Sequence, residues 1–331
     1  MTPTSLGLPF VDSELESRVR SKLLEIEKEL AVAVESDFDF VNEAAHHLLE
    51  AGGKRFRPML VVLASEFGDA RSAAVVPSAL VVELTHLATL YHDDVMDEAD
   101  LRRGAQSANA RWDNSIAILT GDFLFARASE IVAELGSDAV RIQAETFARL
   151  VQGQIRETVG PRGGDNALAH YLSVVADKTG SLIATSARFG ARFSGTSSRI
   201  ERALTDYGES IGTAFQLSDD IIDISSETSD SGKMPGTDLR EGVPTLPTLL
   251  ALDSPGDSQG RLRELLSNPL VDGDQHAEAL HLLRRSPAMQ LARDEVARHT
   301  AAARASLESL PDIPARGALS ALCDLVTIRT S

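Results

Sequence analysis

The 331-residue chain has little of several residue types, and each scarcity excludes something. It contains one cysteine, Cys323, so it can form neither an intrachain disulfide framework nor a zinc site built on cysteines. The longest apolar stretch, residues 73–91, is interrupted by Pro77, Glu83 and His86, and residues 1–20 lack the basic-then-apolar order of a signal peptide. We therefore expect a cytoplasmic protein without a membrane span.

Positive charge is also scarce. The chain has 32 lysines and arginines against 49 aspartates and glutamates, and its formal net charge is −17. Such a chain lacks the basic footprint that nucleic acids require, and anionic lipid would repel it. We expect no nucleic-acid partner and at most a peripheral, hydrophobic membrane contact.

Lysine itself is rare, with five residues against 27 arginines. Three of the five, Lys54, Lys178 and Lys233, lie within two residues of a glycine. Flexible backbone beside a lysine is favourable for phosphate binding, although each segment read alone is as well explained by a solvated turn. The lysines become informative only together with the acidic residues described below.

Segments rich in valine and isoleucine and bounded like strands are missing, and no Pro/Ser-rich linker divides the chain. We predict a single all-α domain spanning residues 1–331. The apolar spacing predicts helices over residues 15–34, 58–67, 75–91, 117–135, 139–158, 167–190, 198–223, 246–252 and 262–310. Residues 160–164 and 225–236 are rich in Gly, Ser and Asp and are predicted loops. The part beyond residue 245 is expected to be structural.

Two acidic pentads lie 126 residues apart. They read Asp93-Asp94-Val95-Met96-Asp97 and Asp219-Asp220-Ile221-Ile222-Asp223. On a helix, positions i and i+4 project from the same face, so the outer carboxylates of each pentad can act together. Carboxylate oxygens are hard ligands, and Mg²⁺ is usually held by one or two of them while substrate phosphates complete its shell. One pentad alone is more often a solvated acidic face, but two copies predict a metal-bound diphosphate.

Positive residues follow each pentad. Arg102 and Arg103 come directly after the first, and Lys233 lies in the 225–236 loop after the second. Guanidinium and ammonium groups at these places suit phosphate oxygens bridged by Mg²⁺. The loop could close over bound metal and phosphate as a lid; a double arginine could also be a solvated helix end.

Taken in order, these motifs resemble the trans-isoprenyl diphosphate synthases, also called polyprenyl synthetases. The resemblance spans residues 40 to 250. Its motifs are Gly53-Lys54-Arg55-Phe56-Arg57-Pro58, Glu83-Leu84-Thr85-His86, His92-Asp93-Asp94-Val95-Met96-Asp97, Arg102-Arg103-Gly104, Gly121-Asp122, Gly153-Gln154, Lys178-Thr179-Gly180, Phe215-Gln216-Leu217-Ser218-Asp219-Asp220-Ile221-Ile222-Asp223 and Gly232-Lys233. The resemblance implies the isoprenoid synthase fold: helices around a deep central cavity, the two aspartate motifs facing each other across its mouth, in a homodimer.

The resemblance also implies a reaction, the head-to-tail condensation of isopentenyl diphosphate onto an allylic diphosphate with three Mg²⁺. It assigns metal binding to Asp93, Asp97, Asp219 and Asp223, and catalytic roles to these aspartates' neighbours Asp94 and Asp220 and to Arg102 and Lys178. It places isopentenyl diphosphate on Lys54, Arg57, His86 and Arg103. It places the allylic substrate on Arg102, Lys178, Thr179, Gln216 and Lys233. Without the resemblance, His86 would be read as a packed core residue.

One position departs from the family pattern. The family often has a Gly-Lys pair shortly before Thr-Leu-Pro, whereas this chain has Gly242-Val243 before Pro244. A second lysine near the predicted lid is therefore replaced by valine. We expect weaker diphosphate binding there and intact chemistry.

Product length follows from side-chain size beneath the first pentad. Ala88 and Thr89 lie five and four residues before Asp93, and both are small. The family's short-chain members tend to have an aromatic residue at one of these positions, so the resemblance implies a product of roughly C30 to C50, at about one isoprene unit per helical turn. Phe147 is the candidate floor of the cavity, or else a core residue.

Three alternatives remain open. A synthase that stops at C20 or below would differ only in cavity depth. A class I terpene cyclase would share the first aspartate motif, but it needs neither the Lys54–Pro58 segment nor the double arginine. A non-catalytic synthase subunit would typically have lost an aspartate motif, and both are present here.

Overall fold

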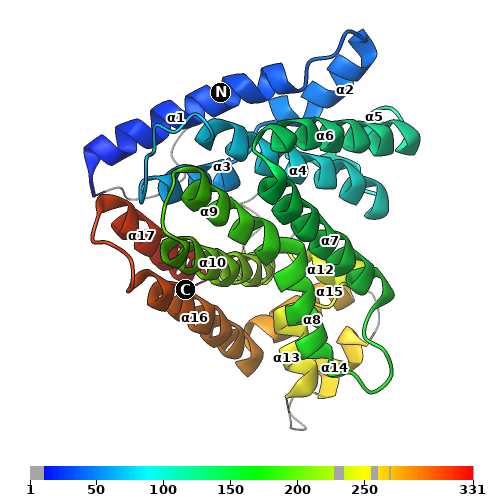
Figure 1. Cartoon of the computed structure of the whole chain (residues 1–331). Helices are drawn as coiled ribbons and strands as arrows, with labels where there is room; N and C mark the ends of the chain where they lie inside the picture. Colours follow the sequence, from blue (N-terminus) through cyan, green and yellow to red (C-terminus); the bar gives the residue numbers. More distant parts are fainter. Residues whose placement is uncertain (1–10, 227–234, 255–259, 268–269, 331) are drawn as a thin grey trace. The chain divides into compact units, whose positions relative to one another are not determined.

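The structure is a computed structural model that describes residues 11–226, 235–254, 260–267 and 270–330 (Figure 1). The chain divides into two compact units. The first unit comprises Met1–Phe147, Leu182–Gly208 and Ser309–Leu319, and the second comprises Ala148–Ser181, Glu209–Glu308 and Ser320–Ser331. Helices α7, α9, α10 and α17 contribute residues to both units, α9 only its first residue to the second unit.

Helices make up nearly all of the regular secondary structure of the described residues, as predicted. The first part of the chain forms α1 (Ser13–Ala33), α2 (Asp39–Glu50), α3 (Phe56–Ser65), α4 (Val75–Met96), β1 (Leu101–Arg102), β2 (Ala105–Gln106), α5 (Ala108–Arg111), α6 (Asn114–Glu134) and α7 (Ser137–Val159). The middle part forms α8 (Ala167–Val175), the π-helical turn η1 (Ala176–Gly180), α9 (Ser181–Phe193) and α10 (Ser198–Ser225). The last part forms α12 (Thr237–Glu241), α13 (Leu246–Asp253), α14 (Gly260–Leu266), α15 (Gly273–Arg284), α16 (Pro287–Leu307) and α17 (Pro314–Ile328). None of the helices in the described ranges combines the length and the hydropathy needed to cross a bilayer.

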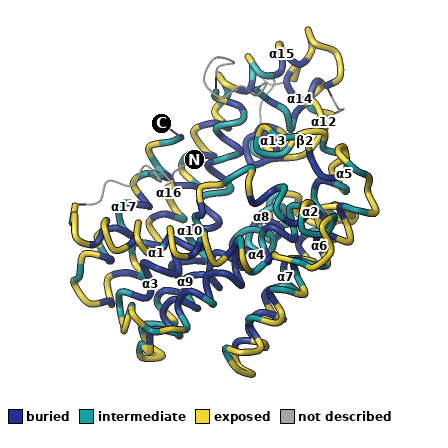
Figure 2. The backbone as a smooth tube through the Cα atoms, turned by 90° about the horizontal axis from the view of Figure 1, so that it is seen from above, coloured by how far each residue is buried: buried dark blue, intermediate teal, exposed yellow. Residues whose placement is uncertain are grey.

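The central element of the first unit is α4, which packs against α1, α3 and α6. Its sequence is apolar on all sides from Val75 to Tyr91, and nearly all of these residues are buried (Figure 2). A helix that is apolar all round is stable only inside a core. The rest of the unit therefore holds α4 in a fixed position, and with it the first acidic pentad in its last turn.

Helix α4 ends in a defined C-terminal capping motif. Glu98 has a left-handed backbone with φ of 49°. The N–H of Glu98 donates to the carbonyl of Val95 at 3.4 Å, and that of Ala99 donates to the carbonyl of Asp94 at 3.0 Å. This pair of bonds is a Schellman motif, which satisfies carbonyls that the end of a helix leaves without partners. It turns the chain back directly after Asp97.

The chain then forms the one strand pair of the described residues, a hairpin with Arg102 opposite Ala105. Arg103 and Gly104 at its turn have φ of 53° and 78°. Positive φ at both central residues is the signature of a type I′ turn, whose twist matches two antiparallel strands. The sequence did not predict this hairpin, because four residues are too few to show an alternating pattern.

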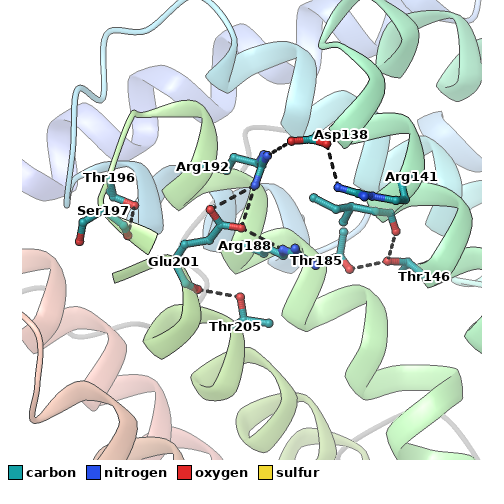
Figure 3. A network of polar contacts seen from close by, with 11 residues as sticks. Asp138, Arg141, Thr146, Thr185, Arg188, Arg192, Thr196, Ser197, Glu201 and Thr205 are labelled. Carbon is teal, nitrogen blue, oxygen red and sulfur yellow. Dashed lines mark hydrogen bonds and ion pairs between the residues drawn. The ribbon is translucent and has the colours of Figure 1, made fainter. Parts of the chain in front are cut away.

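A polar network connects α7, α9 and α10 within the first unit (Figure 3). Arg192 donates to Asp138 at 2.5 Å and to Glu201 at 3.2 Å, and Arg188 donates to Glu201 at 3.0 Å. Guanidinium groups shared between carboxylates in this way form charge-assisted bonds. The network fixes the starts of α7 and α10 relative to α9.

In the second unit, α13 packs against α8, α14, α15 and α16. At its start the backbone N–H of Thr245 donates to Oγ1 of Thr248 at 2.9 Å, as in one half of a capping box. The predicted helix over residues 262–310 is wrong in detail, because it is three helices, α14, α15 and α16. Asp272 and Ser286 cap the second and third of them, and Pro287 follows at a first helical position.

Close packing of α9 against α3 generates a stability prediction. A Cβ atom at Gly190 would lie 2.8 Å from Cβ of Ala64 and closer still to the carbonyl of Val61. We expect Gly190→Ala to lower the free energy of unfolding by about 1–3 kcal/mol through overpacking. Gly317→Ala, where a Cβ would meet nothing within 4 Å, is the control and should gain about 0.5–1 kcal/mol of helix propensity. Urea unfolding of both variants measures this; equal stabilities would contradict the packing argument.

Candidate active site

The first aspartate set, Asp93, Asp94 and Asp97, lies at the end of α4. Asp94 is fully buried, whereas Asp93 is half-buried and Asp97 is exposed. Nε of Arg102 donates to Oδ1 of Asp94 at 2.5 Å, and among the described residues Oδ2 of Asp94 has no hydrogen-bond partner. Burial raises the pKa of Asp94, and the charge of Arg102 opposes this. The middle aspartate thus holds Arg102, while the outer two face the surface where a metal ion could bind.

A cation cluster, defined as Arg57, His86 and Arg103, lies in the same unit. Burial, together with the charge of Arg103, lowers the pKa of Arg57 to about 10. Nε of Arg57 is buried and has no partner among the described residues. Burial, then Arg57 and Arg103, lower the pKa of His86 well below its usual value, so His86 is neutral at physiological pH. Positive groups that repel one another and retain an unused donor suit an anionic ligand.

Arg103 is placed by backbone contacts. Its Nη1 donates to the carbonyl of Gly52 and to that of Leu48 at 3.4 Å. A Cβ atom at Gly53 would lie 2.8 Å from the same Nη1 atom, so the glycine makes room for the guanidinium. The neighbouring Lys54 is exposed. The segment before α3 therefore contacts Arg103 through Gly52 and Gly53, which precede Lys54 in the sequence, and the joint role of Lys54 and Arg103 stays a prediction.

Arg55 belongs to the same basic segment but has a different role. Its guanidinium donates to Glu27 at 2.7 Å, to Glu83 at 3.0 Å and to the carbonyl of Leu49 at 3.1 Å. The side chain is 5% exposed. Arg55 is therefore neutralised inside the core and joins α1 to α4, so it is not available to a substrate. Sequence reasoning missed this role, although Glu83 in the motif before His86 was a signal for it.

The second aspartate set, Asp219, Asp220 and Asp223, lies on α10 in the second unit. Asp220 is buried, and three groups donate to its carboxylate: the Tyr171 hydroxyl, the N–H of Leu246 at 3.3 Å and Nε2 of Gln216 at 3.3 Å. Burial raises the pKa of Asp220 to about 6, and the donors oppose this. Asp220 is thus held from three sides, as Asp94 is held by Arg102.

The outer aspartates of this set have other partners. Nη2 of Arg329 lies 2.8 Å from Oδ1 of Asp219, and the Arg329 guanidinium is 5.0 Å from the centre of the Phe215 ring. The N–H of Thr237 donates to Oδ1 of Asp223 at 3.4 Å. The last residues of the chain therefore contact a predicted metal ligand, which the expectation of a purely structural tail did not include.

Of the predicted allylic residues that the structure describes, Arg102 lies in the first unit beside Asp94, whereas Lys178, Thr179 and Gln216 lie in the second unit. Thr179 donates to Oε1 of Gln216 at 3.2 Å, which links η1 to α10. Lys178, also in η1, forms an ion pair with Glu157 of α7. Lys233 and most of the predicted loop over residues 225–236 lie outside the described residues. π-helical turns occur mostly as single turns within α-helices and are frequent at functional sites, which suits the position of Lys178 and Thr179.

Tyr171 is a residue of this region that sequence reasoning missed. It precedes Lys178 by seven residues, about two helical turns, and donates to Asp220. Burial, then the charge of Asp220, raise the pKa of Tyr171 well above its usual value, so the hydroxyl stays protonated. A tyrosine at this spacing is a weak signal, because its partner is 49 residues away.

The predicted chain-length residues lie in the first unit. Ala88 is buried and Thr89 is half-buried, with its hydroxyl bonded to the carbonyl of His86 at 2.8 Å. Phe147 packs against Phe125 with ring centroids 4.0 Å apart. These contacts do not test the predicted path of the product, which stays a prediction. Val243 is 40% exposed, and its predicted effect on affinity also stays a prediction.

The donor types fit a hard divalent cation. Within the described ranges, no group of three His, Cys, Asp or Glu side chains converges on one point. Mg²⁺ usually takes only one or two protein carboxylates and completes its shell with phosphate and water, so the outer aspartates of each set suffice as protein ligands. An all-α fold with two aspartate sets and a buried cation cluster defines a class of protein: enzymes that bind diphosphate esters.

Comparison with known proteins gives the family. The sequence profile of the polyprenyl synthetase family matches residues 38–283. The chain is 49% identical to the nonaprenyl diphosphate synthase of Mycobacterium tuberculosis over 99% of both proteins, and 43% identical to a dimethylallyltranstransferase of the same organism over 97% of this chain and 96% of the relative. The structure of a geranylgeranyl pyrophosphate synthase from Corynebacterium glutamicum, complexed with calcium and isoprenyl diphosphate, matches 98% of this chain and 100% of its own with a TM-score of 0.89 and 47% identity.

The chain belongs to the polyprenyl synthetase family. It is therefore a prenyltransferase that acts on prenyl diphosphates, and members of the family act with a divalent metal ion. The predicted family, the all-α fold class and the predicted enzyme class are confirmed.

The negative charge of Asp238 in the second unit is unfavourable in the folded protein. Burial, then the charges of Asp223 and Asp220, raise its pKa to about 7. The folded protein thus holds a proton there more tightly than the unfolded chain does, so stability falls as the pH rises through this range. A bound cation would make the ionised form of Asp238 less unfavourable in the folded protein.

We therefore expect Asp238→Asn to raise the free energy of unfolding, by more at about pH 8 than at about pH 5, when a chelator is present. The gain is larger at high pH because only there is the wild-type carboxyl ionised in the folded state. Thermal unfolding at both pH values measures it, with Asp253→Asn at an exposed position as the control. Equal gains at the two pH values would contradict the raised pKa.

Proposed function

We propose that the protein condenses isopentenyl diphosphate head-to-tail onto an allylic diphosphate and makes an all-trans polyprenyl diphosphate of roughly C30 to C50, one isoprene unit per helical turn of about 5.4 Å. One observation carries the proposal. Helix α4 holds His86 of the cation cluster and, seven residues on, Asp93 of the first aspartate set. At a rise of about 1.5 Å per residue, one rigid helix spaces an anion site and a metal site about 10 Å apart.

The cation cluster is the proposed site of isopentenyl diphosphate. Arg57 has an unused buried donor, and Arg103 is held against Gly52 and Gly53. His86 is neutral and can donate one ring N–H to a phosphate oxygen without adding to the repulsion between the two arginines. Exposed Lys54 completes the charge needed for a diphosphate. No metal ion is required at this site.

The allylic diphosphate is the proposed ligand of the metal ions. Three Mg²⁺ held by Asp93, Asp97, Asp219 and Asp223 would neutralise the leaving diphosphate and so weaken the bond to the allylic carbon. Arg102 is oriented by Asp94 and would bind a phosphate oxygen, as would Lys178 and the undescribed Lys233. Thr179 and Gln216 would line the allylic carbons, with Asp220 fixing the Gln216 amide.

The remaining parts of the proposal concern assembly and place. We propose a single functional domain over residues 1–331, a homodimer, and a cytoplasmic location with at most peripheral membrane contact. These follow from the family resemblance and from the single cysteine. The cation cluster favours elongation over cyclisation, because a cyclase has no use for a second diphosphate site.

A shorter product is the second candidate function. It is favoured by the similarity to a geranylgeranyl pyrophosphate synthase and to a dimethylallyltranstransferase. The two candidates share every proposed diphosphate and metal contact. They differ only in how much hydrocarbon the protein accommodates, so product analysis separates them.

Product chromatography after incubation with Mg²⁺, labelled isopentenyl diphosphate and C10, C15 or C20 primers should show a ladder that ends at C30 or beyond. Thr89→Phe should shorten the product, because it adds an aromatic ring about one helical turn before Asp93. Thr89→Val, of similar size, is the control and should keep the wild-type product. A wild-type ladder that stops at C20 would refute the long-chain proposal and leave the chemistry standing.

If both aspartate sets act on one diphosphate, the losses of activity caused by a substitution in each set should not multiply in the double variant. We expect Asp93→Asn and Asp219→Asn each to lower kcat about 10²- to 10³-fold, and the double variant to fall little further. Single-turnover rates at saturating Mg²⁺ measure this. Asp100→Asn, at an exposed position beyond α4, is the control. Losses that multiply would show that the two sets act independently.

A further inference from the structure

We propose that Arg149 of α7 is a positioning residue that fixes the π-helical turn η1 and thereby the direction of Lys178 and Thr179. The inference rests on the allylic role proposed above for these two residues. Arg149 is in the second unit with η1 and is absent from the motifs that mark the family resemblance. It touches neither aspartate set in any described contact, so its predicted effect is on substrate placement.

The turn needs external support. A π-helical turn contains one residue more than an α-helical turn, and such turns are rare because the regular bonding is disturbed. In η1 the hydroxyl of Ser181 donates to the carbonyl of Asp177 at 2.6 Å. The side chains of neighbouring helices supply the remaining contacts. Without them, the extra residue could migrate along the helix and turn Lys178 or Thr179 by up to about 100° around its axis.

Arg149 supplies the largest set of these contacts. Its Nε donates to Oδ1 of Asp177 at 2.9 Å, and its Nη2 donates to the carbonyl of Ala176 at 3.3 Å. The same guanidinium pairs with Glu209 of α10, with Nη2 to Oε2 at 3.3 Å. One planar group thus joins a backbone carbonyl and a side chain of the turn to a second helix. Lysine cannot reproduce this fork geometry.

The backbone of α7 comes equally close. A Cβ atom at Gly153, one turn after Arg149, would lie 2.8 Å from the backbone nitrogen of Lys178. Nη1 of Arg156 donates to Oδ2 of Asp177 at 2.5 Å, so both carboxylate oxygens of Asp177 are bound by arginines of α7. On the α10 side, a Cβ atom at Gly180 would lie 3.2 Å from Oε2 of Glu209. The turn is therefore enclosed by α7 and α10, and Arg149 is the side chain that bonds to both the turn and α10.

Loss of the Arg149 contacts would directly affect the two residues proposed to bind the allylic substrate. Lys178 follows Asp177 in sequence, and Thr179 donates to Gln216 on α10. Loss of Arg149 would leave Asp177 with one arginine, the Ala176 carbonyl without its donor, and Glu209 without its ion pair. The contacts proposed for isopentenyl diphosphate belong to the first unit and involve none of these residues. The effect should therefore fall on one substrate.

The test compares the KM values of the two substrates. In Arg149→Met we expect the KM for a C15 allylic diphosphate to rise about tenfold, the equivalent of about 1.4 kcal/mol, while the KM for isopentenyl diphosphate stays within about twofold. Arg149→Lys should recover only part of the loss. The matched control is Arg141→Met, on the same helix, whose side chain is 67% exposed and pairs with Asp138 (Figure 3). It should change neither KM.

Two further variants make the result decisive. Glu209→Gln keeps the size of the side chain and removes its charge, so it tests the same contact if Arg149→Met does not fold. Lys178→Gln tests the site on which the inference rests. If Lys178→Gln leaves the allylic KM unchanged, the proposed site fails and the inference fails with it. If Lys178→Gln raises the allylic KM while Arg149→Met and Glu209→Gln raise neither KM or both equally, the inference alone is overturned.

Discussion

Burial of like charges near one another, held in place by packed helices, is the constraint on which the rest of the structure depends. Burial, together with the charge of Arg103, lowers the pKa of Arg57, and burial, then the charges of Arg57 and Arg103, lowers the pKa of His86. In the second unit, burial and then the charges of Asp223 and Asp220 raise the pKa of Asp238. The charged form of each group is made less favourable by its neighbours. The groups cannot move apart, because the apolar packing of α4 and the caps of the other helices hold them in place. A ligand of opposite charge would relieve that repulsion. At the proposed sites, an anionic diphosphate would do so for the arginines and a metal ion for the aspartates.

Each charged motif contains residues of two kinds, and helix geometry separates them. Adjacent residues on a helix point about 100° apart, so a run of like residues cannot all face one ligand. Asp94 and Asp220 point inward and are held by donors, whereas Asp97 is exposed. In the same way, buried Arg55 is neutralised by Glu27 and by the buried Glu83, and Arg57 keeps an unused donor. In each motif the buried residue thus orients a neighbouring side chain or a helix, and the other residue is left to bind a ligand. This division explains why each motif contains more than one residue of the same charge.

The helices and both aspartate sets could be predicted from the sequence, because apolar spacing and the i, i+4 repeat are local properties. The contacts that complete the sites could not. Tyr171 reaches Asp220 across 49 residues, and Arg329 reaches Asp219 across 110. The hairpin at Arg103 spans too few residues for a pattern, and η1 looks in sequence like any other part of an amphipathic helix. A π-helical turn is stabilised by what packs against it, so only the three-dimensional arrangement of α7 and α10 reveals it.

Reaction chemistry and product length are separable properties of this fold. Relatives that are 49% and 47% identical to this chain carry names of products as different as nonaprenyl and geranylgeranyl diphosphate. The proposed diphosphate and metal contacts involve many residues on several helices, so we expect a change at any one of them to disturb the reaction. In the proposed mechanism the length of the product depends instead on where the hydrocarbon first meets an obstacle. One large side chain at the position of Thr89 or Phe147 would be enough to be that obstacle, since one isoprene unit extends about one helical turn. Length can therefore vary between close relatives while the charged residues stay fixed, and overall identity is a poor guide to it.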